Sequence, residues 1–231
     1  MNVGIIAPIA MLDKYCKGSI QYCIPAWLLD NDKYFDFYAR KVLDSNNIVI
    51  MDTRTKDGKR QPEDEDITVA AGESLRADMV ITPSVAFHKE RTIAEFFKFR
   101  NSDWGSSFMK DGLIGCVEGA TIEEVVSCAS ILKDHVSYYA VESHLLSFIG
   151  ENLVSDKPEV YIDNRTSPWE INMKRGDIMI SSLPVRLGLS GRLNNNYMPS
   201  PGPLNMLDSR DDYPTITMQN VDDFISHFKG V

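Results

Sequence analysis

Four acidic residues stand at the ends of short apolar runs in this sequence. Asp52 closes "NIVIMD", Glu118 follows "LIGCV", Glu142 closes "YYAVE" and Asp163 closes "EVYID". Carboxyl groups held close together shift one another's pKa values, which produces acid and base partners, and their oxygens also suit a divalent cation. We therefore expect a carboxylate-lined site with Asp52, Asp163 and Glu118 as the candidate catalytic residues. For each carboxylate the alternative is a helix cap or a salt bridge, and Glu142 fits it best because "ESHLL" resembles a helix start.

Polar residues near the other strand ends extend this candidate site to substrate binding. The candidates are Ser84, Gly119, Glu142, Ser181, Ser182, Arg186 and Arg54, the last of which opens the basic stretch "RTKDGKR". His88 and His144 also follow strands, but no H-x-x-x-H spacing is present, and no G-x-S-x-G marks a serine nucleophile. The four cysteines lack C-x-x-C spacing, which argues against a zinc site or a redox pair. We expect neither a metal nor a cofactor.

The elements that must position these residues alternate regularly. Eight strand-like runs are expected at 2–9, 21–27, 47–52, 78–83, 113–119, 138–143, 159–164 and 177–182. Helical patterns lie between them, and several strands are nearly continuous apolar runs, as expected of parallel strands covered on both faces. The sequence predicts a compact (β/α)₈ TIM barrel, an α/β fold forming one domain over 1–231. The alternative is an open doubly wound sheet, which the absence of G-x-G-x-x-G after the first strand disfavours.

Two further segments carry specific expectations. "TIEEVVSCASILKD" has a capping-box spacing from Thr121 to Glu124, and it predicts a helix with Ile122, Val125, Val126, Ala129 and Leu132 on its buried face. The stretch 187–216 is rich in Asn, Pro and Gly, and it predicts a long irregular loop.

Composition limits the class of protein. A net charge of -9 disfavours a general nucleic-acid coat protein, although an enzyme that touches nucleic acid only at its site remains possible. No apolar run approaches the roughly 20 residues that span a bilayer, and the N-terminus is interpreted as a strand rather than a signal peptide. We expect a soluble cytoplasmic protein with free thiols and no membrane partner.

Several of these stretches, taken in order, resemble the tRNA-guanine transglycosylase superfamily, most closely its short viral branch, which places 7-deazaguanine bases into DNA. They are "NVGIIAPIAMLDKYC", "NIVIMDTR", "ADMVITPSV", "LIGCVEGAT" and "RGDIMISSLPVRLGLSGR". The resemblance implies a (β/α)₈ barrel and a base exchange in which a carboxylate attacks C1′ of a nucleotide, with the logic of a retaining glycosidase. It also implies nucleic acid as partner, DNA rather than tRNA, a 7-deazapurine-type base, and a homo- or heterodimer.

The match at single positions is mixed. Asp52 falls on the family's pocket aspartate and Gly119 is kept, whereas Ser84 replaces a second aspartate and Glu118 replaces a glutamine. Ile180 falls on the position of the nucleophilic aspartate, and the zinc motif of the larger tRNA enzymes is absent. A glutamate accepts hydrogen bonds where a glutamine also donates one, so the base that satisfies the site changes.

Three hypotheses follow from these residues. The first is a divergent nucleobase transglycosylase, in which Asp52 is acid, base or nucleophile, Asp163 is the substitute nucleophile and Glu118 reads the base or moves a proton. In it Arg186 and the loop 54–60 meet phosphate. The second is an inactive partner subunit that binds base or nucleic acid. The third is an unrelated barrel enzyme with a metal on Asp52, Glu118, Glu142 and Asp163.

Overall fold

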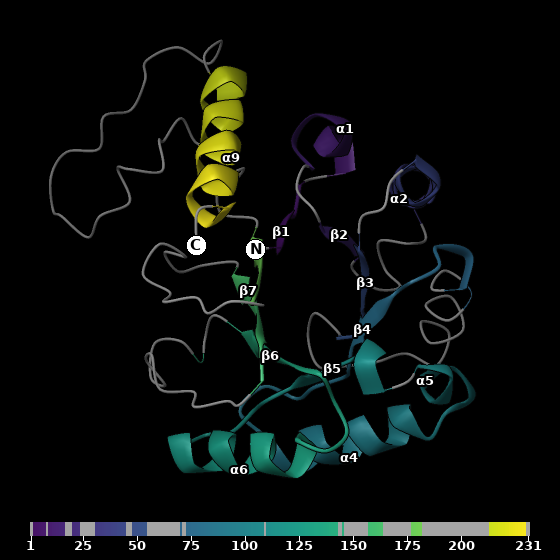
Figure 1. Cartoon of the computed structure of the whole chain (residues 1–231), viewed down its shortest axis with the longest axis vertical. Coiled ribbons are helices and arrows are strands. Elements are labelled where there is room, and N and C mark those ends of the chain that lie inside the picture. Colours follow the sequence, from purple (N-terminus) through teal and green to yellow (C-terminus); the bar gives the residue numbers. More distant parts are fainter. Residues whose placement is uncertain are drawn as a thin grey trace, which may run out of the picture.

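Eight parallel strands form one curled sheet in this protein (Figure 1). The structure is a computed structural model, and it describes residues 2–7, 9–16, 20–23, 31–44, 48–54, 70, 73–108, 110–142, 145, 157–163, 177–181 and 213–229. The strands are β1 (Asn2–Ile5), β2 (Ile20–Cys23), β3 (Ile48–Asp52), β4 (Met79–Ile81), β5 (Leu113–Cys116), β6 (Tyr138–Glu142), β7 (Glu159–Asp163) and β8 (Ile178–Ser181). Each falls within or overlaps one of the eight predicted runs. The predicted parallel α/β architecture is therefore confirmed.

The strands pair in the order β1-β8-β7-β6-β5-β4-β3-β2, so β1 and β2 are the two edges of the ladder. These edge strands nevertheless contact each other. A Cβ built on Gly4 would lie 3.3 Å from the Ile20 Cβ and 3.5 Å from Ile180 Cγ1, so a glycine lets three strands approach closely here. The curl of the sheet thus brings its two edges together.

Alternation along the strands produces two separate apolar clusters. The inner cluster is built from strand side chains on the concave face and includes Ile50, Ile81, Ile114, Ile162 and Ile180, each nearly inaccessible to solvent. The residues between them point outward into a larger cluster shared with the helices. Period-two alternation with both faces buried accounts for the almost unbroken apolar strand sequences.

The helices cover the outer face. They are α1 (Leu12–Tyr15), α2 (Asp32–Asp44), α4 (Lys89–Arg100), α5 (Asp103–Ser107), α6 (Ile122–Leu132) and α9 (Tyr213–Lys229), with short 3₁₀ turns η1 (Ile9–Met11) and η2 (Lys110–Gly112). In Figure 1, α4 and α6 lie side by side, and α9 packs beside β1. Among the described residues, no helix has the length and apolar character to cross a membrane. The predicted loop 187–216 lies outside the described residues except for 213–216, which form the start of α9.

Helix α6 begins as predicted but buries a different stripe. The Thr121 side chain accepts a hydrogen bond from the Glu124 backbone N–H, which confirms the predicted cap. However, Ile122 and Val126 are 43% and 49% exposed. The fully buried side chains are Val125, Cys128 and Leu132. The predicted face was wrong at Ile122 and Val126, since the stripe that packs inward runs through Val125, Cys128 and Leu132.

Two aspartates fix the strands at the amino edge of the sheet. Asp78, just before β4, accepts a hydrogen bond from the Val49 N–H of β3 at 2.8 Å. Asp177, just before β8, accepts one from the Glu159 N–H of β7 at 2.8 Å. Each carboxylate satisfies a backbone N–H near the start of a neighbouring strand and thereby helps to set the stagger between two adjacent strands.

Candidate functional site

Arg54 joins two of the predicted carboxylates across the carboxyl edge of the sheet. Its Nε and Nη2 donate to the two oxygens of Asp52 at 2.9 and 2.5 Å, a bidentate pairing. Its Nη1 lies 2.7 Å from Oε1 of Glu142. Asp52 ends β3 and Glu142 ends β6, so one guanidinium bridges strands that are not neighbours in the sheet. The sequence predicted that these side chains meet at one edge, and the structure brings them together.

Burial makes this cluster unlike a surface salt bridge. The Asp52 side chain is 4% exposed, that of Arg54 12% and that of Glu142 30%. The Arg54 backbone N–H also donates to Asp52 Oδ1 at 2.9 Å, which fixes the turn after β3. Water therefore reaches the cluster mainly from the Glu142 side. Because the surroundings are partly desolvated, charges here interact more strongly than in solvent.

Glu118 is fully buried beyond the end of β5 and holds the loop that follows β4. Its Oε2 accepts a hydrogen bond from the Phe87 backbone N–H at 3.0 Å. Phe87 has a φ of 62°, a left-handed conformation that is costly for a bulky residue, and its side chain is 50% exposed. The buried carboxylate is thus connected to a strained backbone position in the β4–α4 loop. No sequence pattern predicts this φ, so Phe87 was missed.

Cys116 lies among these charges and was also missed. Its buried thiol belongs to the inner cluster and donates to the Thr82 carbonyl at 3.2 Å. Burial raises the pKa of the Cys116 thiol well above its ordinary value, the Arg54 charge lowers it, and the charges of Glu142, Asp52 and Glu118 raise it. Cys116 precedes Glu118 by two residues, so the two-residue alternation of a strand could have predicted that both side chains lie on the same face.

Gly119 and Ser84 have plainer environments. A Cβ on Gly119 would lie 2.6 Å from the Glu124 Cβ and 2.8 Å from the Val125 backbone N, so glycine is required for close packing against the start of α6. Ser84 lies half-buried in the β4–α4 loop. Their prediction as substrate-binding residues stays a prediction.

Strand β8 brings an apolar residue to the position that the resemblance assigns to the nucleophile. Ile180 is fully buried in the inner cluster, and its Cα pairs with Gly4 of β1 and Ile162 of β7. Ser181 is fully buried at the end of β8. Its Cα pairs with Asp163, whose side chain lies outside the described residues, as do Ser182 and Arg186. The roles predicted for Asp163, Ser182 and Arg186 stay predictions.

The arrangement suits a ligand that donates hydrogen bonds. Ionised carboxylates are acceptors only, and a guanidinium presents a planar fork of N–H donors. A ligand edge with two adjacent N–H groups has the same shape as the Arg54 fork and can pair with Asp52 in the same way. Among the residues that the structure describes, no group of three His, Cys, Asp or Glu side chains is placed to hold a metal ion.

The fold and the site define a parallel α/β protein with a carboxylate–guanidinium cluster at the carboxyl edge of its sheet. No family model matches the chain, and no curated protein matches it. Among solved structures the chain is similar to N-(5'-phosphoribosyl)anthranilate isomerase from Pyrococcus furiosus, with 10% identity over 100% of both chains and a TM-score of 0.48. A likeness of this degree does not bear on activity.

Proposed function

We propose that this protein is a divergent nucleobase transglycosylase that introduces a 7-deazapurine-type base into nucleic acid, with DNA as the favoured polymer. The observation that supports it is the cluster of Asp52, Arg54 and Glu142 at the carboxyl edge, beside the buried Glu118. In parallel α/β folds this edge is where ligands bind. We also propose that β1 and β2 complete a closed (β/α)₈ barrel, since Gly4 and Ile20 already lie in contact range.

Base recognition follows from the pairing of Arg54 with Asp52. A purine edge with adjacent ring and exocyclic N–H groups offers Asp52 the same two donors that the Nε and Nη2 groups of Arg54 offer now. Binding then requires the guanidinium to leave Asp52 and to move outward, where it can meet a phosphate oxygen. Arg54 thus occupies the base position until a base arrives.

Base exchange needs a carboxylate that reaches C1′ of the nucleotide. A carboxylate oxygen bonds to C1′ while the C1′–N bond breaks, and the departing base takes the electron pair and a proton. The incoming base then attacks C1′ through nitrogen, loses its proton and releases the carboxylate. Asp163 supplies the attacking oxygen while Asp52 pairs with the base edge, and Glu118 carries the proton.

The test is incorporation of a labelled 7-deazapurine base into DNA, together with trapping of a covalent protein–DNA species. We expect both in the native protein, and we expect Asp52→Asn or Asp163→Asn to abolish both. Asp36→Asn is the matched control because Asp36 is exposed on α2. Absence of incorporation, or a covalent species that persists in both variants, refutes this function.

A second candidate function is an inactive subunit that binds base or nucleic acid beside a catalytic partner. Ile180 favours it, because its apolar side chain fills the position that the resemblance assigns to the nucleophile. A pull-down against a catalytic homologue from the same genome distinguishes the two. A monomer that turns over alone excludes the subunit role. Metal analysis of the purified protein tests the third hypothesis, a metal held by the same carboxylates.

A further inference from the structure

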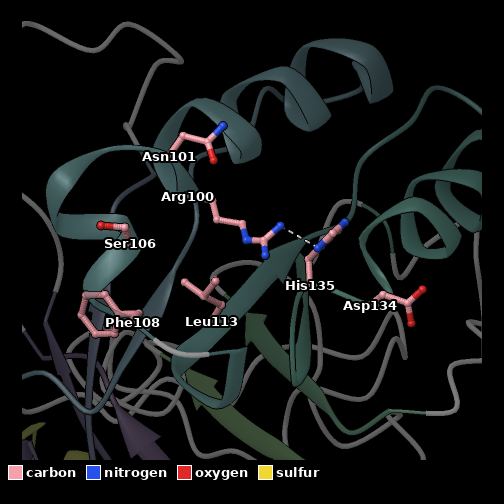
Figure 2. Close-up of a pocket in the computed structure, with 8 residues that line it drawn as sticks. Arg100, Asn101, Ser106, Phe108, Leu113, Asp134 and His135 are labelled. Atoms are coloured by element: carbon pink, nitrogen blue, oxygen red, sulfur yellow. Dashed lines mark hydrogen bonds between the residues drawn. The ribbon is translucent and has the colours of Figure 1, made fainter.

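A polar cavity opens at the amino edge of the sheet, at the opposite end from Asp52 and Glu142. It has a volume of about 460 Å³, within the range of small-molecule sites, which is roughly 300–1,000 Å³. It lies between the end of α4, helix α5, the start of β5 and the turn that precedes β6 (Figure 2). The residues that matter for its chemistry are Arg100, Asn101, Ser106, Asp134 and His135.

Arg100 and His135 point toward each other in this cavity. Nη1 of Arg100 lies 2.7 Å from Nδ1 of His135. Arginine has no acceptor, so Nδ1 must accept this hydrogen bond, and the imidazole is neutral with its proton on Nε2. Phe97 supports the ring from one side with an edge contact at 5.1 Å between centroids. The histidine therefore fixes the direction of the guanidinium.

The charge of Arg100 is not balanced by a carboxylate in the described part of the chain. Among the described residues, the Arg100 side chain forms one hydrogen bond, to His135, and no salt bridge. Asp134 lines the same cavity, but its carboxylate points away from Arg100 (Figure 2). A guanidinium has five N–H donors, so a forked set of donors remains directed at the cavity.

We propose that this cavity is a second ligand site that binds the phosphate group of a small phosphorylated molecule through Arg100. Two N–H groups of the guanidinium would pair with two phosphate oxygens, while His135 keeps the third direction fixed. The Asn101 amide lies at the rim as a further donor. A small ligand is favoured over a nucleic-acid strand because the cavity volume of about 460 Å³ suits a small phosphorylated molecule.

A structural role for Arg100 makes a different prediction. Arg100 lies in the last turn of α4, where a positive charge offsets the negative end of the helix dipole. Lys98 stands in the same turn with an exposed side chain and serves that role equally. Arg100→Lys keeps the charge for the helix but removes the planar fork. Arg100→Lys and Lys98→Met therefore distinguish a ligand-binding role of Arg100 from a role in stabilising the helix end.

The experiment is calorimetric titration of inorganic pyrophosphate into the full chain at low ionic strength, with a single-stranded oligonucleotide as a second titrant. We expect saturable binding of pyrophosphate at one site per chain. Arg100→Met and Arg100→Lys should each weaken it by roughly tenfold or more, and Lys98→Met should leave it within about twofold. Circular dichroism confirms that each variant is folded.

Equal pyrophosphate binding by all four proteins, or no saturable binding, overturns the proposal. The proposal is also overturned if oligonucleotide binding depends on Arg100 and pyrophosphate binding does not, because the ligand is then a polymer. Oligonucleotide binding that is indifferent to Arg100 supports a site for small ligands. None of these outcomes depends on base exchange at the opposite edge of the sheet.

Discussion

Replacing Arg54 with methionine removes the guanidinium that joins Asp52 and Glu142, while keeping most of the apolar stem of the side chain. Two hydrogen bonds are lost, from Nε and Nη2 to Asp52 at 2.9 and 2.5 Å, together with the ion pair between Nη1 and Glu142 at 2.7 Å. The Asp52 carboxylate then loses the guanidinium that pairs with it. Its side chain is only 4% exposed, so little water reaches it in place of Arg54.

The magnitude follows from burial. Removing one partner of a buried ion pair costs about 3–5 kcal/mol, since the remaining charge stays desolvated. Asp52 falls under this rule, whereas Glu142 adds little because its side chain is 30% exposed and remains partly hydrated. We expect the Arg54→Met variant to lose about 3 kcal/mol of unfolding free energy. For a chain of this length the Tm then falls by roughly 6–12 °C.

The assay is urea unfolding followed by far-ultraviolet circular dichroism at neutral pH. Asp52→Asn and the double variant complete a double-mutant cycle, in which we expect a coupling energy of about 2 kcal/mol. Arg40→Met is the matched control because the Arg40 side chain is exposed and, among the described residues, donates only to the Asp36 carbonyl. It should change stability by less than about 0.5 kcal/mol. If Arg54→Met costs under about 1 kcal/mol and the cycle shows no coupling, then the cluster is no more than a surface ion pair.

Three further predictions concern single positions. Burial raises the pKa of Cys128 to about 11 and that of Cys116 well above its ordinary value. At about pH 8, roughly one Cys128 thiol in a thousand is therefore ionised. Peptide mapping after iodoacetamide treatment should find both thiols unmodified until the protein unfolds. Gly119→Ala should cost about 1–3 kcal/mol in urea unfolding, because the new methyl overlaps the first turn of α6; unchanged stability would show that this turn gives way freely. Phe87→Gly should raise the unfolding free energy by about 1 kcal/mol, because glycine adopts a φ of 62° without strain, and a loss of stability would mean that the ring packs more than its exposure indicates.

Alternation and turn chemistry made most of the fold predictable. Strands β3 and β6 are short runs with residues buried on both faces, and no competing pattern is present at 48–52 or 138–142. The Thr121 cap was predictable because it needs only local spacing. The buried face of α6 was not fully predictable, because which stripe packs inward depends on the neighbouring α4 rather than on α6 itself.

The candidate site was likewise predictable from the sequence only in part. Strand periodicity predicts that Asp52 and Glu142 end at one edge of the sheet. It does not predict that Arg54 turns inward to join them, because "RTKDGKR" is indistinguishable from a solvated basic loop by composition alone. The backbone N–H of Phe87, whose φ is left-handed, donates to the buried Glu118, thirty-one positions away in the chain, and no local pattern predicts such a contact.

The aspartates just before β4 and β8 separate the residues that hold the sheet together from those that could carry its chemistry. Asp78 and Asp177 set the strand stagger at one edge, whereas the candidate site lies at the other. A substitution at the carboxyl edge therefore leaves the stagger intact. An engineer can therefore vary side chains at the carboxyl edge while the stagger set by Asp78 and Asp177 is kept.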